Sequence, residues 1–157
     1  MSAFSGTHAN RPMQIDFYLL AKTQVADKHH YACRIARIAH SKGMTVFMQT
    51  ADAAHSELLD RLLWTFAQDS FVPHAVCANG EHDTARYPVQ IGHAGAPPDC
   101  AGLLIPLARE TAPGDDCEKF QRIAEVVLNE DADKAAGRAR FRFYRERGFE
   151  PRTHNIT

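Results

Sequence analysis

The chain alternates short apolar runs with longer stretches in which apolar residues recur at helical spacing. Ile15–Leu20 and Met44–Met48 are apolar runs of strand length. Between them, apolar residues recur at i, i+4 and i+7 from Tyr31 to Ala39, and a basic last turn and a glycine stop follow at Lys42-Gly43. This pattern predicts a strand, a helix and a second strand.

The middle of the chain predicts another helix and several short strands. The helix covers Ala53–Ala67, where the apolar stripe consists of Ala54, Leu58, Leu62 and Phe66, widened by Leu59 and Leu63. Apolar runs separated by turn-rich segments predict strands at Phe71–Cys77, Val89–Ile91 and Gly102–Pro106.

Two more helices are predicted toward the end of the chain. Asp115 or Asp116 can cap a helix with one apolar face, made of Phe120, Ile123, Ala124, Val127 and Leu128. A last helix runs from near Asp133 to Arg147 and stops at Gly148. Because strands alternate with helices, we predict an α/β fold: a single three-layer domain around a mostly parallel sheet.

Length and composition fit one ordinary globular domain. The chain has 157 residues, of which 45% are hydrophobic and 24% charged. Residues 1–12 mix small and polar residues without a period, so we expect a flexible leader there and the domain over 13–157. No run approaches the roughly 18 apolar residues of a membrane span, and the start lacks the features of a signal peptide. We therefore expect a cytoplasmic protein.

The predicted order of elements is nucleotide-binding-like, but the chemistry of such proteins is missing. Residues 21–25, after the first strand, contain no glycine to cradle a phosphate, and no Gly-x-x-x-x-Gly-Lys or Gly-x-Ser-x-Gly motif is present. The four cysteines form no Cys-x-x-Cys pair, which argues against a zinc site and favours buried free thiols. Asp16 and Asp52 suit capping or surface roles better than a metal site. We expect no catalytic residue, no cofactor and no metal.

Trp64 lies off the apolar stripe of its predicted helix. At 100° per residue it falls about 200° from Leu62, whereas Leu58, Leu59 and Leu63 fall within about 100°. An outward indole exposes a large apolar area, and tryptophan is enriched at interface hot spots. Either a partner covers Trp64 or a neighbouring turn around Asp69-Ser70-Phe71 does.

The last predicted helix carries a basic stripe. Seven basic and two acidic residues lie between Lys134 and Arg152, although the net charge of the chain is only −1. Lys134, Arg138, Arg142 and Arg145 share an arc narrower than a quarter turn, with Phe141 beside it. Three interpretations stay open: a solvated helix face, a site for an acidic peptide with a hydrophobic tip, and a phosphate track for nucleic acid.

Several runs resemble the chi subunit of bacterial DNA polymerase III. They are Asp16-Phe17-Tyr18-Leu19-Leu20, Leu63-Trp64-Thr65-Phe66 leading into Ser70-Phe71-Val72-Pro73-His74, Pro88-Val89-Gln90-Ile91, and the segment from Arg138 to Phe149 that ends in Gly-Phe. The resemblance covers about residues 13–150. It departs from the family at Phe141 and Arg142, where the family has Tyr and Lys, and it is loose from Ala94 to Glu118.

The resemblance implies an accessory subunit with no catalytic activity and no cofactor, linked to the clamp loader through the psi subunit. Such subunits also bind the acidic, Phe-terminated tail of single-stranded DNA-binding protein, so contact with DNA is indirect. The implied tail-binding residues are Lys134, Arg138, Phe141, Arg142, Arg145 and Val127, and the implied psi-binding residues are Trp64, Phe71 and Val72. A small nucleotide-binding enzyme and a direct single-stranded DNA-binding protein remain the alternatives.

Overall fold

A computed structural model of the chain describes residues 13–65, 72–77, 83–94, 96, 99–109 and 115–157. Its elements follow in the order β1 (Gln14–Leu20), α2 (Val25–Ser41), β2 (Val46–Gln49), α3 (Ala53–Thr65), β3 (His74–Val76), β4 (Val89–Gly92), β5 (Leu103–Pro106), the short 3-10 helix η1 (Asp115–Lys119), β6 (Arg122–Val127), α4 (Asp131–Glu146) and β7 (Arg152–Ile156). The predicted leader at residues 1–12 lies outside the described residues.

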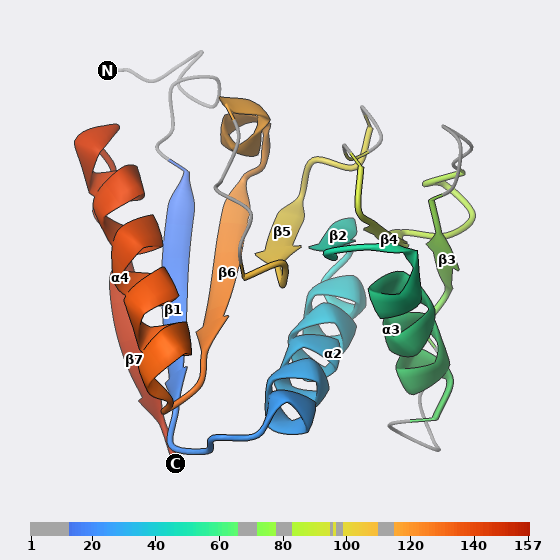
Figure 1. Ribbon diagram of the computed structural model, residues 1–157. Helices are drawn as coiled ribbons and strands as arrows, with labels where there is room; N and C mark the ends of the chain where they lie inside the picture. Colours follow the sequence, from blue (N-terminus) through green and yellow to red (C-terminus); the bar gives the residue numbers. More distant parts are fainter. Residues whose placement is uncertain (1–12, 66–71, 78–82, 95, 97–98, 110–114) are drawn as a thin grey trace, which may run out of the picture.

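The strands form one seven-stranded sheet in the order β3-β4-β2-β5-β6-β1-β7 (Figure 1). The six strand pairings of the described chain are all parallel. Parallel strands need crossover connections, and α2, α3 and α4 supply those between β1 and β2, β2 and β3, and β6 and β7, with helices on both faces of the sheet. The predicted α/β class with a mostly parallel sheet is confirmed.

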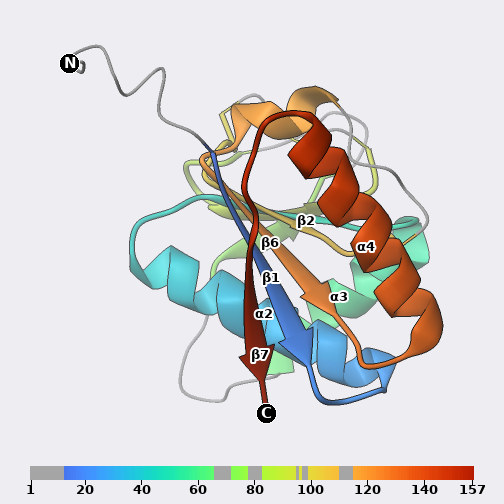
Figure 2. The same ribbon diagram turned by 90° about the vertical axis from the view of Figure 1, so that its left-hand side faces the viewer.

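Side chains that alternate along the strands divide the core into two layers. Val46 and Met48 of β2 face α2 and α3, where Ala36 and Leu63 lie, whereas Phe47 between them faces the α4 side. Figure 2 shows α2 and α4 on opposite sides of the sheet. In the described part of the chain, no helix is long and apolar enough to cross a membrane.

The predicted helix over Phe120 to Leu128 is wrong. Residues 122–127 form β6, and only residues 115–119 are helical. β6 lies between β5 and β1, so Ile123 through Val127 are buried on both faces of the sheet. A strand buried on both sides has no period of two, and its apolar run also satisfies helical i, i+4 spacing.

Two smaller differences concern which residues of the helices are buried. In α3 the buried residues are Ser56, Leu59 and Leu63, while Leu58 is 40% exposed, so the predicted stripe is displaced around the helix. In α2 the small residues Ala32 and Ala36 face the core and Ile38 is exposed, because small side chains let the helix lie close to the sheet.

The edge strand β7 was not predicted. Its residues are mostly polar, and it pairs in parallel with β1 from Arg152 opposite Asp16 to Ile156 opposite Leu20. Buried Asp16 fastens this edge by accepting hydrogen bonds from Arg152 at 3.2 Å and from His154 at 2.8 Å.

Candidate functional site

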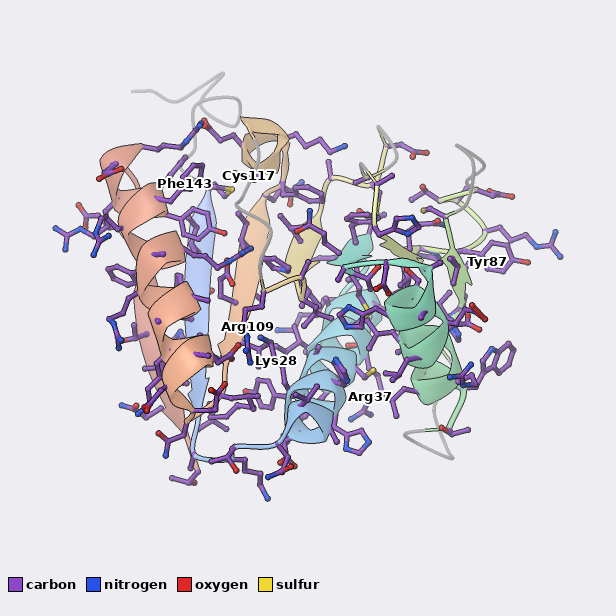
Figure 3. All side chains as sticks on the ribbon, viewed as in Figure 1. Lys28, Arg37, Tyr87, Arg109, Cys117 and Phe143 are labelled. Atoms are coloured by element: carbon purple, nitrogen blue, oxygen red, sulfur yellow. The ribbon has the colours of Figure 1, made fainter. Side chains whose placement is uncertain are left out.

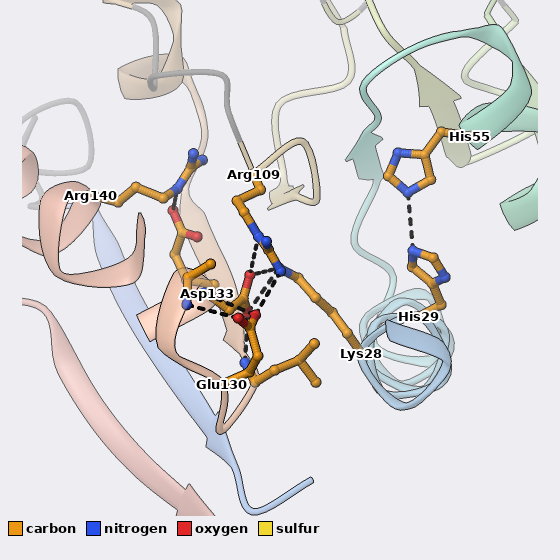
Figure 4. Close-up of polar contacts among 10 residues, drawn as sticks. Lys28, His29, His55, Arg109, Glu130, Asp133 and Arg140 are labelled. Atoms are coloured by element: carbon orange, nitrogen blue, oxygen red, sulfur yellow. Dashed lines mark hydrogen bonds and ion pairs between the residues drawn. The ribbon is translucent and has the colours of Figure 1, made fainter. Parts of the chain in front are cut away.

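Helix α4 is fastened to the rest of the molecule at its first turn. The Glu130 carboxylate caps the helix by accepting hydrogen bonds from the N–H groups of Ala132 at 2.8 Å and Asp133 at 3.1 Å. Asp133 is buried and accepts hydrogen bonds from Lys28 of α2 at 3.0 Å and from Arg109 at 2.9 Å (Figure 4). The side chains of Lys28 and Arg109 lie next to each other in Figure 3, and both reach Asp133 in the first turn of α4.

Burial and these partners act in opposite directions on Asp133. Burial raises the pKa of its carboxyl, but hydrogen bonds from the Leu128 N–H and from Lys28 outweigh burial, and the pKa lies below its ordinary value. The carboxylate therefore stays ionised, and its negative charge is held by Lys28 and Arg109. This arrangement fixes the position of the first turn of α4 relative to α2 and to the end of β6.

A second buried cluster holds the middle of α4 against β6. Glu125 of β6 accepts hydrogen bonds from the Arg140 Nε at 2.7 Å and from the Tyr144 hydroxyl at 2.6 Å. Arg140 is only 7% exposed, and its guanidinium is ion-paired with Glu125. Burial and the neighbouring Glu125 charge raise the pKa of Tyr144, so its hydroxyl keeps its proton and acts as a donor.

Gly137 lets α4 approach β6 closely. A Cβ at this position would lie 3.1 Å from Val127 Cγ2 and 3.3 Å from Cγ1, so any larger residue would push against Val127. Beside this contact, an apolar pocket of about 270 Å³ opens between α4 and the sheet. Its lining combines strand, loop and helix residues: Phe17, Leu19, Leu20, Val127, Leu128, Asn129, Lys134, Gly137, Arg138, Phe141 and Thr153.

This pocket, which we call the α4 pocket, contains four of the six residues predicted to bind an acidic tail. Val127 is buried in its wall, and Lys134 and Arg138 are exposed at its rim. Phe141 is half-buried, with its ring centroid 5.2 Å from that of Phe17. Arg142 and Arg145 are exposed on α4 outside the lining of this pocket.

The cations of α4 and of its C-cap fall into two groups. Arg140 is paired with Glu125, and Arg147 is paired with Glu118 and lies over the Phe143 ring at 4.5 Å. Phe143 and Cys117 lie where η1 meets α4 (Figure 3). By contrast, Lys134, Arg138, Arg142 and Arg145 have no ion pair or side-chain hydrogen bond with any residue that the structure describes. Exposed cations without internal partners beside an apolar pocket suit an anionic ligand with an apolar end.

The other predicted surface lies on α3, at the far end of the sheet from α4 (Figure 1). Trp64 is 59% exposed, and its ring packs edge-on against His74, with centroids 5.2 Å apart. Val72 is 1% exposed and belongs to the core, so its side chain does not reach the surface. Phe71, and the turn expected to cover Trp64, lie outside the described residues.

The carboxylates considered for a metal site are engaged elsewhere. Asp16 is buried among Arg122, Arg152 and His154, and Asp52 accepts a hydrogen bond from the His55 N–H at 2.8 Å. Among the described residues, no three His, Cys, Asp or Glu side chains are grouped so that they could hold a metal ion. The four cysteines are free, and burial raises the pKa of Cys33 to about 12.

Sequence reasoning missed most of the pocket wall. Phe17 and Leu19 alternate along β1, which places them on one face, but nothing in the sequence shows that α4 crosses that face. Thr153 was missed because β7 was not predicted, and Gly137 was passed over although a glycine within a helix signals a close approach. The cations were found because all four lie on one helix.

Comparison with known proteins supplies the family. Residues 13–152 match the profile of the DNA polymerase III chi subunit, HolC. The DNA polymerase III subunit chi of Pseudomonas aeruginosa is 36% identical over 143 residues, which cover 91% of this chain and 96% of the relative. The subunit chi of Escherichia coli is 30% identical over 87% of this chain and 94% of the relative, and that of Haemophilus influenzae is 28% identical over 89% and 95%. The chain therefore belongs to the DNA polymerase III chi subunit family.

Proposed function

We propose that this chain is a non-catalytic accessory subunit of DNA replication that acts in the cytoplasm as an adaptor. Through the α4 pocket, the domain over residues 13–157 binds the acidic C-terminal tail of single-stranded DNA-binding protein. Through the surface around Trp64, it attaches to the psi subunit and so to the clamp loader. Its contact with DNA is indirect.

The observation that supports this proposal most directly is the α4 pocket with cations at its rim. The pocket is lined by apolar side chains such as Phe17, Leu19 and Phe141, and its volume of about 270 Å³ can hold one aromatic side chain. Lys134 and Arg138 at the rim can pair with a terminal carboxylate. Arg142 and Arg145 add positive charge along the same helix, which favours the approach of acidic residues.

The surface around Trp64 is the proposed attachment to psi. Buried His74 holds the start of β3 against α3, because one ring nitrogen lies 2.6 Å from the Val72 carbonyl oxygen and the other 3.1 Å from the Asp60 carbonyl oxygen. The indole therefore rests on a fixed support, and an interface anchor with little freedom to lose binds at low entropic cost. The proposal keeps Phe71 as a psi-binding residue. Val72 is buried, so its role in the proposal is to support this surface from within the core.

The test of tail binding is calorimetry with a short acidic peptide that ends in Phe with a free carboxylate. Arg138→Ala should weaken binding by about 1–3 kcal/mol, as expected for the loss of a charge-assisted hydrogen bond. Arg34→Ala removes the same charge from an exposed position on α2, across the sheet from α4, and should leave the affinity unchanged. Equal affinities of the wild type and Arg138→Ala would contradict the placement of the site.

Two further measurements distinguish the alternative functions. A clear rise in melting temperature with nucleotides and divalent metal ions would favour a nucleotide-binding enzyme. Binding of a bare oligonucleotide, with an affinity that falls steeply as salt rises, would favour a direct single-stranded DNA-binding protein. The adaptor binds the oligonucleotide only when single-stranded DNA-binding protein coats it.

A further inference from the structure

In the part of the chain that the structure describes, no helix lies over β1 and β7 on the face of the sheet opposite α4. Phe17 and Leu19 of β1 and Thr153 of β7 line the α4 pocket, so the residues that alternate with them point to the other face. On that face α2 packs against β2 and β6, and α3 packs against β3 and β4. In Figure 2 the β7 edge faces the viewer, with α4 beside it and α2 behind it. Parallel sheets are normally covered on both faces, so this part of the sheet has room for another layer.

A row of three aromatic rings crosses this part of the sheet. The ring of Tyr18 on β1 lies beside that of Tyr31 on α2, with centroids 5.7 Å apart, and stacks on that of His154 on β7, with centroids 5.1 Å apart. All three side chains are half-buried. Ile35 of α2 and Ile156 of β7 are also half-buried, and they pack with Tyr31 against one buried cluster. These five residues form a surface that we call the open face.

The edge of α2 that borders the open face is apolar and then basic. Tyr31, Ile35 and Ile38 follow one another at spacings of four and three, and Ile38 is 42% exposed. Arg34 is exposed, lies four residues before Ile38, and has no ion pair or side-chain hydrogen bond with any described residue. An exposed apolar helix edge beside a row of half-buried rings is the kind of surface that a second protein covers.

Positive charge exceeds negative charge around the open face. Arg122 and Arg152 both pair with Asp16, at 3.0 and 3.1 Å, so two cations share one acid. Lys28 is neutralised by Asp133. The other charged groups on β1, on β7, on the near side of α2 and at the ends of these elements bring the total to five cations against three acids: Lys22, Arg34, Lys42, Arg122 and Arg152 against Asp16, Asp27 and Glu150. This excess favours a partner that carries acidic residues beside its apolar ones.

From these observations we propose that the open face binds an amphipathic helix of a partner protein, apolar on one side and acidic along its flank. The helix lies beside α2, with its apolar residues on Tyr18 and Ile156 and its acidic residues toward Arg34 and Arg152. This surface is separate from the α4 pocket and from the surface around Trp64, and the proposal does not depend on the proposed function.

The dimensions of the open face fit one helix of about three turns. Each strand of a sheet is about 4.8 Å wide, so β1 and β7 together match the diameter of a helix, which is about 10 Å. β7 pairs with β1 over five residues. Five strand residues extend over about 16 Å, which is the length of about three helical turns.

The arrangement of the rings favours a helix over single-stranded nucleic acid. A base that binds by stacking needs a free ring face. The rings of Tyr18 and His154 stack on each other, with an interplanar angle of 20°, so they use these faces within the chain. Ring edges and aliphatic side chains then remain for the ligand, and apolar side chains of a helix pack on such groups.

A displayed library of helical peptides tests this inference with the wild-type protein as the target. Each peptide has about three turns held by a side-chain crosslink, varied apolar residues at i, i+3, i+4 and i+7, and Glu on the flanks. The affinities of the selected peptides are then measured by fluorescence anisotropy. Replacing each Glu by Lys should weaken binding by about tenfold or more, because the charges then repel. A version without the crosslink and with Pro at its centre should lose binding, because Pro breaks a helix.

Two variants of the protein, each with a matched control on α3, locate the site. Ile38→Glu should weaken binding by about tenfold, because it places a carboxylate against an apolar and acidic ligand. Arg34→Glu should weaken binding by about fivefold, as expected for the loss of an exposed ion pair. The controls Leu58→Glu, at a position 40% exposed, and Arg61→Glu, also exposed, should change the affinity by less than about twofold. All four positions are exposed, so the fold should tolerate each change.

The other occupants of the open face give different results, and each would overturn the inference. The inference is wrong if no peptide binds, or if Ile38→Glu and Leu58→Glu have the same effect. Equal binding of the Pro version would mean that the β7 edge takes an extended strand instead. Dimers of the wild type that Ile38→Glu abolishes in sedimentation would mean that a second copy covers the face, and peptides that bind only after deletion of residues 1–12 would assign it to that segment. Binding of a thymidine oligonucleotide that depends on Arg34 would assign it to nucleic acid.

Discussion

The arginines of α4 and of its C-cap have the same side chain but differ in what surrounds it. Arg140 is buried against Glu125, and Arg147 lies near the surface beside Glu118. Arg138, Arg142 and Arg145 are exposed and lack such a partner in the part of the chain that is described. Because a buried charge without a counter-charge is costly and an exposed one is not, Arg140 should matter for stability, and the exposed arginines without an internal partner should matter for binding.

We expect Glu125→Gln to lower the free energy of unfolding by about 3 kcal/mol, because it leaves the buried Arg140 guanidinium without its counter-charge. The matched control is Glu118→Gln, which breaks the ion pair between Glu118 and Arg147. The side chains of this pair are more exposed, 45% for Glu118 and 31% for Arg147. That change should cost less than about 1 kcal/mol. Urea denaturation of the two variants makes the comparison, and equal losses would contradict the assignment of Glu125 as the structural partner.

Helices with one polar face, and short apolar runs between turn-rich segments such as β4 and β5, were predictable from the sequence. The last helix was placed within two residues of its observed start, and its glycine stop at Gly148 has a φ of 93°. The sequence did not predict two of the strands, for opposite reasons. β6 is buried on both faces, and the spacing of its apolar residues also fits a helix, whereas β7 is polar and is held by its pairing with β1. The apolar residues of β6 therefore fit a helix as well as a strand, and β7 has no apolar run that would indicate a strand.

The same limit applies to the candidate site. Its cations were found because they lie on one helix and their positions follow from 3.6 residues per turn. The apolar wall forms only where α4 crosses β1 and β6. This crossing brings Phe141 against Phe17, although more than 120 residues separate the two in the sequence. Local periodicity carries no information on such a contact, so a pocket between elements becomes visible only in the folded chain.

Gly137→Ala tests whether the close packing of α4 on β6 shapes the pocket. Alanine favours a helix by about 1 kcal/mol over glycine, which offsets the strain from a Cβ placed 3.1 Å from Val127, so stability should change by less than about 1 kcal/mol. Binding of the acidic peptide should weaken about threefold or more, because either α4 must move away from the pocket wall or Val127 must move within that wall. A change of about 1 kcal/mol in the free energy of binding corresponds to about a fivefold change in affinity.

The control for this variant is Ala139→Gly, at an exposed position two residues further along α4. It should lower stability by about 1 kcal/mol and leave the peptide affinity unchanged, the reverse of the effect at Gly137. Calorimetry and urea denaturation on both proteins give the two quantities. A Gly137→Ala protein with wild-type affinity would show that the spacing between α4 and β6 does not govern the pocket.

At the scale of the whole molecule, one contact between α2 and α3 makes stability depend on pH. The His55 Nδ1 accepts a hydrogen bond from the Ala51 N–H, so its neutral ring carries the proton on Nε2 and donates to the His29 Nε2 at 3.1 Å. Burial, and then the charges of His55, Lys28 and His30, lower the pKa of His29 to about 4. The native state therefore holds His29 neutral at pH 7.

Since an unfolded histidine titrates near pH 6.5, the unfolded chain binds the extra proton first as pH falls from about 6.5 to 4. The contribution of neutral His29 to the free energy of unfolding is therefore complete above pH 6.5. About 3 kcal/mol of this contribution is lost as pH falls through this window. Urea denaturation at a series of pH values measures the slope. His29→Gln should reduce the dependence of the unfolding free energy on pH, whereas His30→Gln, at an exposed position, should not. Equal slopes in the wild type and both variants would contradict the assignment of this pH dependence to His29.

The two proposed binding surfaces lie at opposite ends of the sheet, with α4 over β1 and α3 beside β3 and β4. Residues so far apart, with no shared partner, should act additively. Trp64→Ala should weaken binding to purified psi by about 2 kcal/mol or more, as for an interface anchor, and leave the affinity for the acidic peptide unchanged. Arg138→Ala should do the reverse.

The double variant Trp64→Ala, Arg138→Ala completes the cycle, with each affinity measured by calorimetry in the presence and absence of the other ligand. Independent sites give a coupling free energy below about 0.5 kcal/mol for both ligands. An adaptor needs this independence, because a subunit that stays attached to the clamp loader must release and rebind the tail without loosening the first contact. A coupling of about 1 kcal/mol or more would mean that the sheet transmits binding from one edge to the other.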